Sequence, residues 1–379
     1  MKDRTTPNMG QAAFRIGDAS DDAGLRRLLR DNPVPGSFSL ALVREPDFFM
    51  GAEIEGDVTH TVVACEEGSD RLLGLGGRAV RTAWINGERA RLGYFGQLRI
   101  DRDARGRKGL LIGGFDALRE LWKEGETPFL VTTIIQGNAA ATRALTSGRP
   151  GMPTYVPRDV LCTLALSLRR RRSIPRCPGI ELRRACGDHL EDVARCLRRN
   201  YRRFQFAPVW TADDLADERR CRGLLPGDFV IALRGGDLVG CLATWDQSSF
   251  KQTVVHGYPP ALRLFRPLVN LVGPLTGLPH LPPVGRTLPH AYFSHIAADG
   301  DDPDVLVAMM TRAFNDALGR GWSYVTLAFA EGNPMLHAVK AAFRHIEYRS
   351  RIYLVHWEEG RAAVDAVDDR IPHLELAVL

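Results

Sequence analysis

One pattern of residues occurs twice in this chain, and this duplication constrains the fold more than any other feature. Phe129–Asn138 (FLVTTIIQGN) and Tyr324–Asn333 (YVTLAFAEGN) are both strand-like runs that end in an acid or amide, Gly and Asn, and each precedes an apolar helix start. Further upstream, Phe14–Ile16 and Ile180–Leu182 each precede a helical pattern. A repeat of this length predicts two similar folding units joined in tandem.

The length of the chain agrees with two units, because half of 379 residues is enough to bury a separate core. The chain is 45% hydrophobic and 25% charged, which is normal for a globular protein. We expect an N-terminal unit over residues 1–170, called the first half below, and a C-terminal unit over 171–379, called the second half. The second half contains a Pro- and Leu-rich insert at 257–290 that has no counterpart in the first.

The predicted elements follow the same order in both halves. Each half begins with a strand and a helix, continues with a hairpin, and ends with strands that alternate with helices. This order predicts an α/β (α+β) fold with a mixed sheet and helices on both of its faces. The apolar tail, His373–Leu379, is expected to add an edge strand.

Charge and cysteine content narrow the functional classes. A net charge of +5 only weakly indicates an anionic ligand. The dense run Arg169–Arg172 reads as a solvated linker rather than a nucleic-acid surface, because no basic face interleaved with aromatic residues accompanies it. Seven scattered cysteines without a C-x-x-C pair favour reduced thiols and no zinc site.

The first residues of the chain and its hydropathy pattern indicate where in the cell the protein is expected. Met1–Gln11 is polar and lacks the apolar segment of a signal peptide. No stretch of about 20 apolar residues is free of proline and charge, so no membrane span is predicted. We therefore expect a cytoplasmic protein without a metal ion.

The order of elements, with Asn138 directly after the fifth strand, resembles the GNAT superfamily of acyl-CoA-dependent N-acyltransferases in a tandem, two-domain form. In that family a hydrophobic strand leads into a turn of the form Gln/Arg-x-x-Gly-x-Gly/Ala at a helix start. Free backbone N–H groups there bind the pyrophosphate of coenzyme A, since a helix N-terminus favours an anion and glycine lets it approach. The turn here, RGRKGL over 105–110, lacks one of the small residues in either alignment.

The resemblance implies a set of contacts to acetyl-CoA or another acyl-CoA in the first half. These are Leu98, Arg99, Ile100, Arg105, Gly106, Arg107, Lys108, Gly109, Leu110 and Asn138. Two plainer interpretations stay open: the turn is a basic cap on a surface helix, and Asn138 is an ordinary N-cap. In the second half the corresponding turn, Ala298–Pro303, carries three carboxylates. We expect it to have lost coenzyme binding, because an acidic turn repels pyrophosphate.

The resemblance identifies the catalytic groups less directly than the coenzyme contacts. The family often has a tyrosine seven residues after the asparagine as the acid for the leaving thiolate, and Leu145 stands there. A thiol is acidic enough to leave with little help. In the family the acceptor enters between the first loop and the fourth strand, so the catalytic candidates are Tyr94, Glu45 and Asp47. A carboxylate of raised pKa would suit a general base, although each of these two also reads as a solvated loop acid.

The expected function is direct transfer of an acyl group from acyl-CoA to an amine of a small molecule or peptide, with backbone amides of the fourth strand polarising the thioester. Two alternatives remain: a FemX-like transferase that uses aminoacyl-tRNA, and a non-catalytic binding or scaffold protein on a degenerate GNAT fold. For the insert 257–290 the sequence allows a cover over the groove between the halves, an oligomer contact such as a homodimer, or a helix on a membrane surface.

Overall fold

A computed structural model describes residues 12–34, 39–122, 127–276 and 280–379 of the protein. The strands of the first half are β1 (Ala12–Ile16), β2 (Ser39–Val43), β3 (Val58–Glu66), β4 (Leu72–Ile85), β5 (Glu88–Ile100), β6 (Leu130–Ile135) and β7 (Thr154–Ser167). Its helices are α1 (Asp22–Asp31), α2 (Phe48–Glu53), α3 (Leu110–Trp122) and α4 (Ala139–Leu145).

The second half repeats this order around its insert. Its strands are β8 (Ile180–Arg184), β9 (Phe229–Arg234), β10 (Asp237–Trp245), β11 (Gln252–Gly257), β12 (His290–Ala298), β13 (Tyr324–Ala330) and β14 (His345–His356). Its helices are α5 (Leu190–Tyr201), α6 (Ala212–Ala216), α7 (Pro260–Thr276), α8 (Pro303–Ala317), α9 (Pro334–Ala342) and α10 (Arg361–Asp365).

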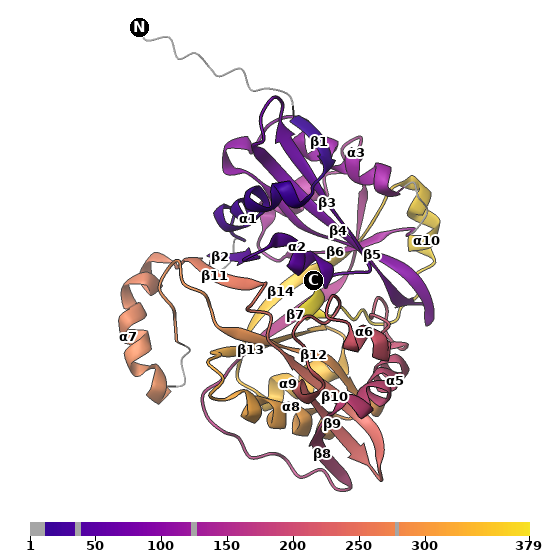
Figure 1. Ribbon diagram of the computed structural model, residues 1–379, viewed down its shortest axis with the longest axis vertical. Coiled ribbons are helices and arrows are strands. Elements are labelled where there is room, and N and C mark those ends of the chain that lie inside the picture. The colour runs from indigo at the N-terminus through magenta and orange to yellow at the C-terminus, as the bar shows by residue number, and fades with distance from the viewer. Residues whose placement is uncertain (1–11, 35–38, 123–126, 277–279) are drawn as a thin grey trace.

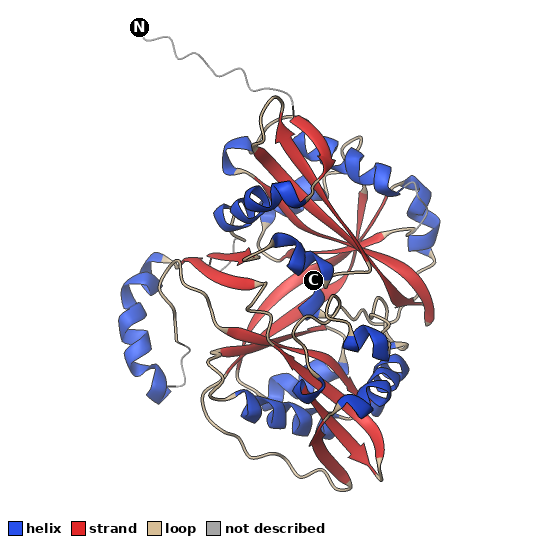
Figure 2. Cartoon of the chain, in the orientation of Figure 1, coloured by secondary structure: helices blue, strands red, loops and turns tan. Residues whose placement is uncertain are grey.

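One sheet of twelve strands runs through both halves in the order β1-β3-β4-β5-β6-β14-β7-β13-β12-β10-β9-β8 (Figure 1). Helices lie on either side of this sheet (Figure 2). Strands β5 and β6 are parallel, as are β12 and β13, while the other neighbouring pairs are antiparallel. The mixed α/β architecture that the order of elements predicts is confirmed.

The two halves exchange their final strands. Strand β7 pairs with β13 of the second half, and β14 lies between β6 and β7 of the first half. The exchange extends to the cores: Cys162, Leu164 and Leu166 of β7 pack into the main core of the second half. In return, Ile352 and Leu354 of β14 pack with buried residues of the first half. Neither half therefore completes its sheet or its core with its own residues.

A second, smaller sheet also joins the halves. Strand β2 of the first half pairs antiparallel with β11 of the second, from Ser39–Gly257 to Val43–Gln252. At its end the side chain of Gln252 accepts a hydrogen bond from Glu45 N (3.0 Å) and donates one to Glu45 O (2.8 Å). The segment between α1 and α2 is therefore partly a strand, and its partner β11 lies directly before the insert.

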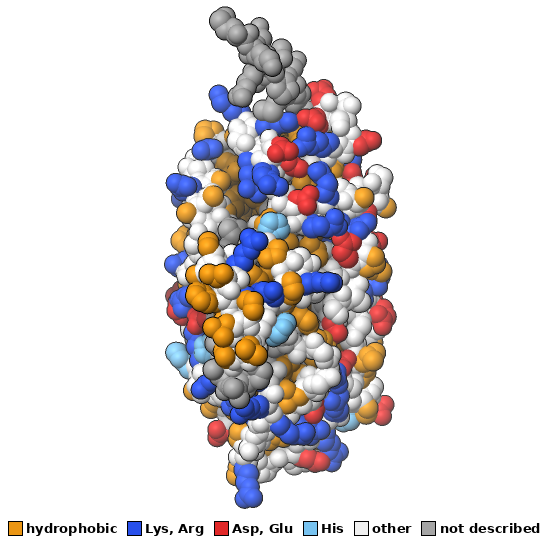
Figure 3. Space-filling model, turned by 90° about the vertical axis from the view of Figure 1, so that its left-hand side faces the viewer, with side chains coloured by type: hydrophobic (Ala, Val, Ile, Leu, Met, Phe, Trp, Pro, Cys, Tyr) orange, Lys and Arg blue, Asp and Glu red, His pale blue; other side chains and the backbone are white. Residues whose placement is uncertain are grey.

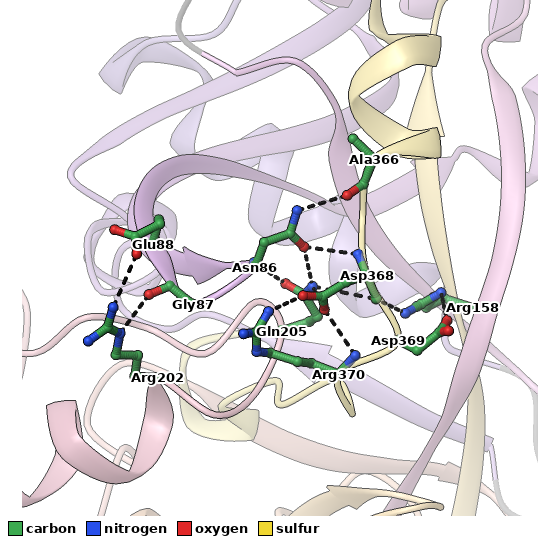
Figure 4. Close-up of polar contacts among 10 residues, drawn as sticks. All are labelled: Asn86, Gly87, Glu88, Arg158, Arg202, Gln205, Ala366, Asp368, Asp369 and Arg370. Carbon is green, nitrogen blue, oxygen red and sulfur yellow. Dashed lines mark hydrogen bonds and ion pairs between the residues drawn. The ribbon is translucent and has the colours of Figure 1, made fainter.

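A polar cluster around the buried Gln205 holds the segment before the tail against both halves (Figure 4). The fully buried side-chain amide of Gln205 donates to Asn86 Oδ1 (2.5 Å) and Asp368 Oδ1 (2.6 Å), and its oxygen accepts from Asn86 N (2.9 Å). Asn86 in turn donates to Ala366 O (2.8 Å). Because buried polar groups are costly when left unpaired, this cluster fixes the path of the chain after α10.

The tail does not form the predicted edge strand. Leu376–Val378 is a short 3-10 turn, and Ala377 and Val378 are fully buried between the two halves. Its carbonyl groups are bound by side chains: Arg81 Nη2 donates to Val378 O (2.7 Å) and Gln247 Nε2 to Ala377 O (2.9 Å). The apolar residues of the tail are buried, but these side-chain contacts satisfy its carbonyl groups, so the tail needs no strand partner.

We predict that Ile352→Ala destabilises the protein as a whole. Ile352 is fully buried on β14 between β6 and β7, so its truncation should lower the free energy of unfolding by about 2–5 kcal/mol. Urea unfolding should remain one transition, because each core contains a strand of the other half. Leu225→Ala, at an exposed position, is the control and should change stability by less than about 0.5 kcal/mol. Two separate transitions, only one of them shifted, would contradict the exchange.

Candidate functional site

The candidate site begins where β5 and β6 separate. These parallel strands pair only at Gly93–Leu130 and Tyr94–Val131, and both continue beyond that point. Just past the last pair, Thr132 Oγ1 donates a hydrogen bond to Phe95 O (2.6 Å). From this point a side-chain hydrogen bond replaces the backbone hydrogen bonds between the two strands. Beyond it the strands diverge and leave a V-shaped opening between them, called the V below.

A β-bulge shapes one arm of this V. The register of β4 and β5 shifts between Leu75 and Gly77, and Gln97 opposite this shift has a left-handed backbone with φ 56°. Bulges bend a strand and redirect its groups, and a non-glycine residue at positive φ is uncommon. The bulge turns the backbone of β5 at the point where Gln97 borders a cavity.

This cavity has a volume of 460 Å³ and lies between the two halves. Tyr94, Gln97 and Asn138 line it from the first half, and Tyr348 and Ser350 of the exchanged strand β14 line it from the second. The other second-half lining residues include Lys251, Thr253, Tyr258, Leu281, His290, Tyr292, Tyr324 and Thr326. Both halves therefore build the walls of one cavity.

The walls are mostly apolar, and their charged side chains are all cationic. Arg44, Arg99 and Lys251 line the cavity, and no Asp or Glu does so among the described residues. Arg44 is paired with the buried Glu55. Burial lowers the pKa of Lys251 to about 8 and that of Arg99 to about 10. The cavity is thus a desolvated, electropositive environment.

Two side chains on the walls hold defined positions. The hydroxyl of Tyr94 lies 3.2 Å from Thr133 Oγ1, and burial raises the pKa of Tyr94 to about 12, so it is protonated at neutral pH. Lys251 Nζ donates to Leu379 O (3.1 Å) and Ala377 O (3.3 Å), which ties the tail to the wall of the cavity.

The glycine turn lies at the start of α3. Gly106 (φ 87°) and Gly109 (φ 81°) have backbones that favour glycine, and a side chain added at either would meet no atom within 4 Å. Of the cations, Arg105 donates to Asn32 Oδ1 (2.9 Å) and Arg107 pairs with Glu66 (3.0 Å), while Lys108 is exposed. The turn therefore presents an open backbone next to a helix N-terminus.

Asn138 begins α4, and its side-chain oxygen accepts a hydrogen bond from Ala141 N (3.2 Å). It also lines the cavity, so both interpretations of this residue are geometrically compatible. Leu98 and Arg99 line the cavity as well, and Ile100 ends β5 above the turn. The structure thus brings Tyr94, Gln97 and Asn138 to one cavity.

The two carboxylates proposed as bases lie elsewhere. Glu45 pairs with Arg26 and, at 2.5 Å, with Arg30 on the outer side of α1. Asp47 accepts a hydrogen bond from Phe49 N (2.7 Å) as the N-cap of α2. Neither residue lines the cavity, so the structure does not bring them together with Tyr94. Their catalytic role stays a prediction from sequence.

The second half has the same V, but its own tail fills it. Strands β12 and β13 pair only from His290–Tyr324 to Tyr292–Thr326, and the bulge residue His295 has φ 52°. His295 N donates to the carboxylate of Glu375 (2.8 Å), and the Tyr201 hydroxyl lies 3.3 Å from the same oxygen. A carboxylate of the protein itself therefore occupies the position beside the bulge amide.

The turn before α8 is closed as well. Asp302 caps the helix by accepting hydrogen bonds from Asp304 N (3.0 Å) and Val305 N (3.2 Å). Asp299 pairs with Arg199 of α5 (2.8 Å), and the Asp301 carboxylate pairs with Arg203, which lies just beyond the end of that helix. The amides that would meet a phosphate thus already have carboxylate partners.

Sequence reasoning missed the wall that the second half supplies. Tyr348, Ser350 and Lys251 lie far along the chain from Tyr94, and only the strand exchange and the β2–β11 pair bring them near. Tyr155, a tyrosine that follows α4 in the sequence, packs among Phe115 and Tyr353 in the core. Within the described residues, no group of three or more His, Cys, Asp or Glu is placed to hold a metal ion.

Burial of Glu375 has a consequence for stability. Removal from water raises the pKa of this carboxyl to about 7. The folded protein then keeps a proton that the unfolded chain, with a pKa of about 4.3, has released. The native state binds more protons in this window, so the group lowers stability progressively as the pH rises from about 4.5 to about 7.

We therefore predict that Glu375→Gln is stabilising at high pH relative to the parent protein. The difference in free energy of unfolding should grow by about 1.4 kcal/mol per pH unit between about pH 5 and 7, and then level off. Urea unfolding over a pH series measures it. Glu358→Gln, at an exposed carboxylate, is the control and should give a constant difference. Parallel curves for Glu375→Gln would mean that this carboxyl is not buried in the V.

Comparisons with known proteins agree on the fold. No family model matches the sequence, and no curated protein matches it in sequence. A tandem GNAT protein from the clavulanic acid biosynthesis pathway matches with a TM-score of 0.55 and 14% identity, over 91% of this chain and 98% of that one. Saccharomyces cerevisiae N-myristoyltransferase with bound myristoyl-CoA and inhibitors matches with 0.58 and 11%, over 98% and 88%.

A third match is the fungal multi-domain GH3 β-N-acetylglucosaminidase that has a GCN5-related glucosamine N-acetyltransferase region. Its TM-score is 0.61 at 12% identity over 93% of this chain, and this chain spans 39% of that protein's length. At such identities the likeness establishes the fold. The chain has the GCN5-related N-acetyltransferase fold in its tandem form.

Proposed function

We propose that the protein is an acyl-CoA-dependent N-acyltransferase with a single working site, which the first half supplies and the second half completes. The shared fold supports the reaction class, because structural neighbours include an N-myristoyltransferase with bound myristoyl-CoA. The observation that carries the proposal is the contrast between the two V-shaped openings. The first leads into a cavity, and the second holds Glu375 of the tail.

The donor side of the proposed site follows β5 from the turn to the bulge. The pyrophosphate of the acyl-CoA would bind the amides at the start of α3, where Gly106 and Gly109 leave room. The acyl thioester would then reach Gln97. The pairing of His295 N with Glu375 in the second half supports this, because there the equivalent bulge amide donates a hydrogen bond to a carboxyl oxygen.

The acceptor would bind on the side of the cavity that the second half forms. With 460 Å³ and largely apolar walls, the cavity is larger than an acetyl group needs, so it has room for a longer acyl chain or a bulky amine. Desolvation and the nearby cations Arg99 and Lys251 disfavour an ammonium ion. The acceptor amine would therefore be neutral when bound, which makes a carboxylate base unnecessary.

In the reaction, the amine nitrogen forms a bond to the thioester carbon, the carbon–sulfur bond breaks, and the amine loses one proton while the coenzyme A thiolate gains one. The Gln97 amide would stabilise the oxyanion. Tyr94, protonated and held beside Thr133, would donate a hydrogen bond to the departing thiolate. Tyr94 would thus assist the leaving thiolate, a role that Leu145 cannot take because its side chain has no hydrogen-bond donor.

The coenzyme site predicts that Gly109→Asp weakens acyl-CoA binding. The substitution places a negative charge and a side chain where the phosphate must approach, and should cost about 2 kcal/mol, or roughly thirtyfold in affinity. Calorimetric titration with coenzyme A and with acyl-CoA esters measures it.

Gly300→Asp is the matched control, because Gly300 occupies the turn of the second half with φ 68° and equally open surroundings. It introduces the same backbone strain and should leave the affinity unchanged. Loss of binding in Gly300→Asp alone would move the site to the second half. If the parent protein bound no acyl-CoA, the proposed function would fail, and a binding or scaffold protein would become the better account.

The proposed role of Tyr94 predicts a loss of rate rather than of binding. Tyr94→Phe should lower kcat by about tenfold to a hundredfold while leaving acyl-CoA affinity within about a factor of two, because the pyrophosphate site is separate. Tyr155→Phe, in the core and away from the cavity, is the control and should keep full activity. Steady-state kinetics with an accepted amine, found by screening amines with a free-thiol assay, measures both variants. Unchanged kcat in Tyr94→Phe would show that another group assists the thiolate.

A further inference from the structure

Exposed apolar side chains gather around α7. Of the large hydrophobic residues that are exposed in the described chain, four lie on this helix: Leu264 (74%), Phe265 (54%), Leu268 (54%) and Leu271 (75%). Their spacing places them on one side of the helix. Two more exposed residues lie on connected segments: Val284, where the insert returns and pairs with β11, and Leu42 on β2, the strand paired with β11. These six residues are called the α7 face below.

The orientation of α7 is the reverse of that of an ordinary surface helix, which turns its apolar side to the core. Here polar side chains face the protein: Arg266 Nη1 donates to Leu281 O (3.2 Å), and Asn270 Nδ2 donates to the same oxygen (3.0 Å). Asn270 Oδ1 accepts from Leu281 N (2.8 Å). Because polar contacts anchor the helix, these three leucines and Phe265 are left in solvent.

The charge of this region has one sign. Between Asp246 and Asp299 the chain contains no Asp or Glu, while Arg263 and Arg286 are exposed there. Arg169 adds a cation at the end of α7 by donating to Gly273 O (2.5 Å). Figure 3 views this side of the molecule and shows hydrophobic side chains with Lys and Arg among them and few acidic ones. The surface is thus apolar and cationic together.

We infer that the α7 face docks the protein onto an anionic lipid bilayer. A helix with exposed Leu and Phe and flanking arginines binds in the plane of the interface, with apolar burial and attraction to anionic headgroups acting together. At 17 residues, α7 is about 25 Å long, and no helix in the described parts of the chain is long and apolar enough to cross a membrane. The helix therefore lies on the membrane.

A second copy of the chain fits this surface less well. A two-fold interface brings identical patches together, so Arg263 and Arg286 would meet a surface of the same charge without carboxylates to pair with. An anionic bilayer supplies the missing charge over the whole face. Of the three interpretations of the insert, the geometry of α7 favours the membrane-surface helix, while Tyr258 and Leu281 beside it line the cavity as a cover would.

Docking in this orientation would place the cavity near the lipid. Leu42 belongs to the α7 face and also lines the cavity, and Pro282, whose carbonyl accepts a hydrogen bond from the Tyr258 hydroxyl (2.7 Å), lines it as well. An apolar acyl chain or acceptor could then pass between bilayer and cavity without crossing water. The docking itself does not depend on the acyl transfer.

Co-sedimentation of the full chain with vesicles tests the inference. We expect binding to vesicles of phosphatidylglycerol and phosphatidylcholine, weaker binding at high salt, and little binding to phosphatidylcholine alone. The double variant Phe265→Ser, Leu268→Ser should bind at least about tenfold more weakly, because it removes two apolar side chains that would enter the bilayer interface. Arg263→Glu should weaken binding to anionic vesicles specifically.

Leu225→Ser is the matched control, since Leu225 is 59% exposed and lies outside the α7 face; it should bind as the parent protein does. All these positions are exposed, so thermal melting should confirm intact folds. The inference is overturned if the parent protein ignores anionic vesicles or if the double variant binds them equally well. It is also overturned if light scattering shows a dimer that the double variant abolishes while vesicle binding is absent, because the α7 face would then bind a second copy.

Discussion

The structure depends above all on the exchange of the final strands between the two halves. Strand β14 lies between β6 and β7, and β7 pairs with β13, so each half needs a strand of the other to complete its sheet and core. The cavity is a direct result, because the same exchange carries Tyr348 and Ser350 to the opening between β5 and β6. A site assembled in this way requires both copies of the fold even if only one of them binds a coenzyme.

The two openings of the repeated fold have opposite electrostatics. In the first half, basic residues surround open glycines, and the charged side chains that line the cavity are cationic in the described part of the chain. In the second half, Asp302 caps α8, Asp299 and Asp301 are paired with arginines in and just after α5, and Glu375 accepts a hydrogen bond from the bulge amide. Under the proposed function, the corresponding backbone amides would face a substrate in the first half, while in the second half they bind carboxylates of the protein.

Much of the fold could be predicted from sequence, because the repeat around Asn138 and Asn333 and the alternation of strands and helices are local patterns. The strand exchange could not be predicted in this way. Pairing β14 with β6 satisfies the same backbone hydrogen bonds and buries the same alternating residues as pairing β14 with a strand of its own half would. The prediction of an edge strand in the tail was wrong for a related reason: Arg81 and Gln247, which are far away in sequence, bind the carbonyl groups of the tail. For the site, position relative to a motif selects Tyr94 and Asn138, and both line the cavity. Glu45 and Asp47 were chosen by residue type, which does not reveal that the first pairs with Arg26 and Arg30 and that the second caps α2.

The most direct test of the central claim is a crystal structure of the full chain with coenzyme A bound. The account predicts pyrophosphate density at the amides of residues 107–110, a thiol directed toward Gln97 and Tyr94, and β14 lining the opposite wall of the cavity. It also predicts that Glu375 stays bound to His295 N. Coenzyme density at the start of α8, or a tail displaced from the second opening by the coenzyme, would contradict the claim that only the first half carries the working site.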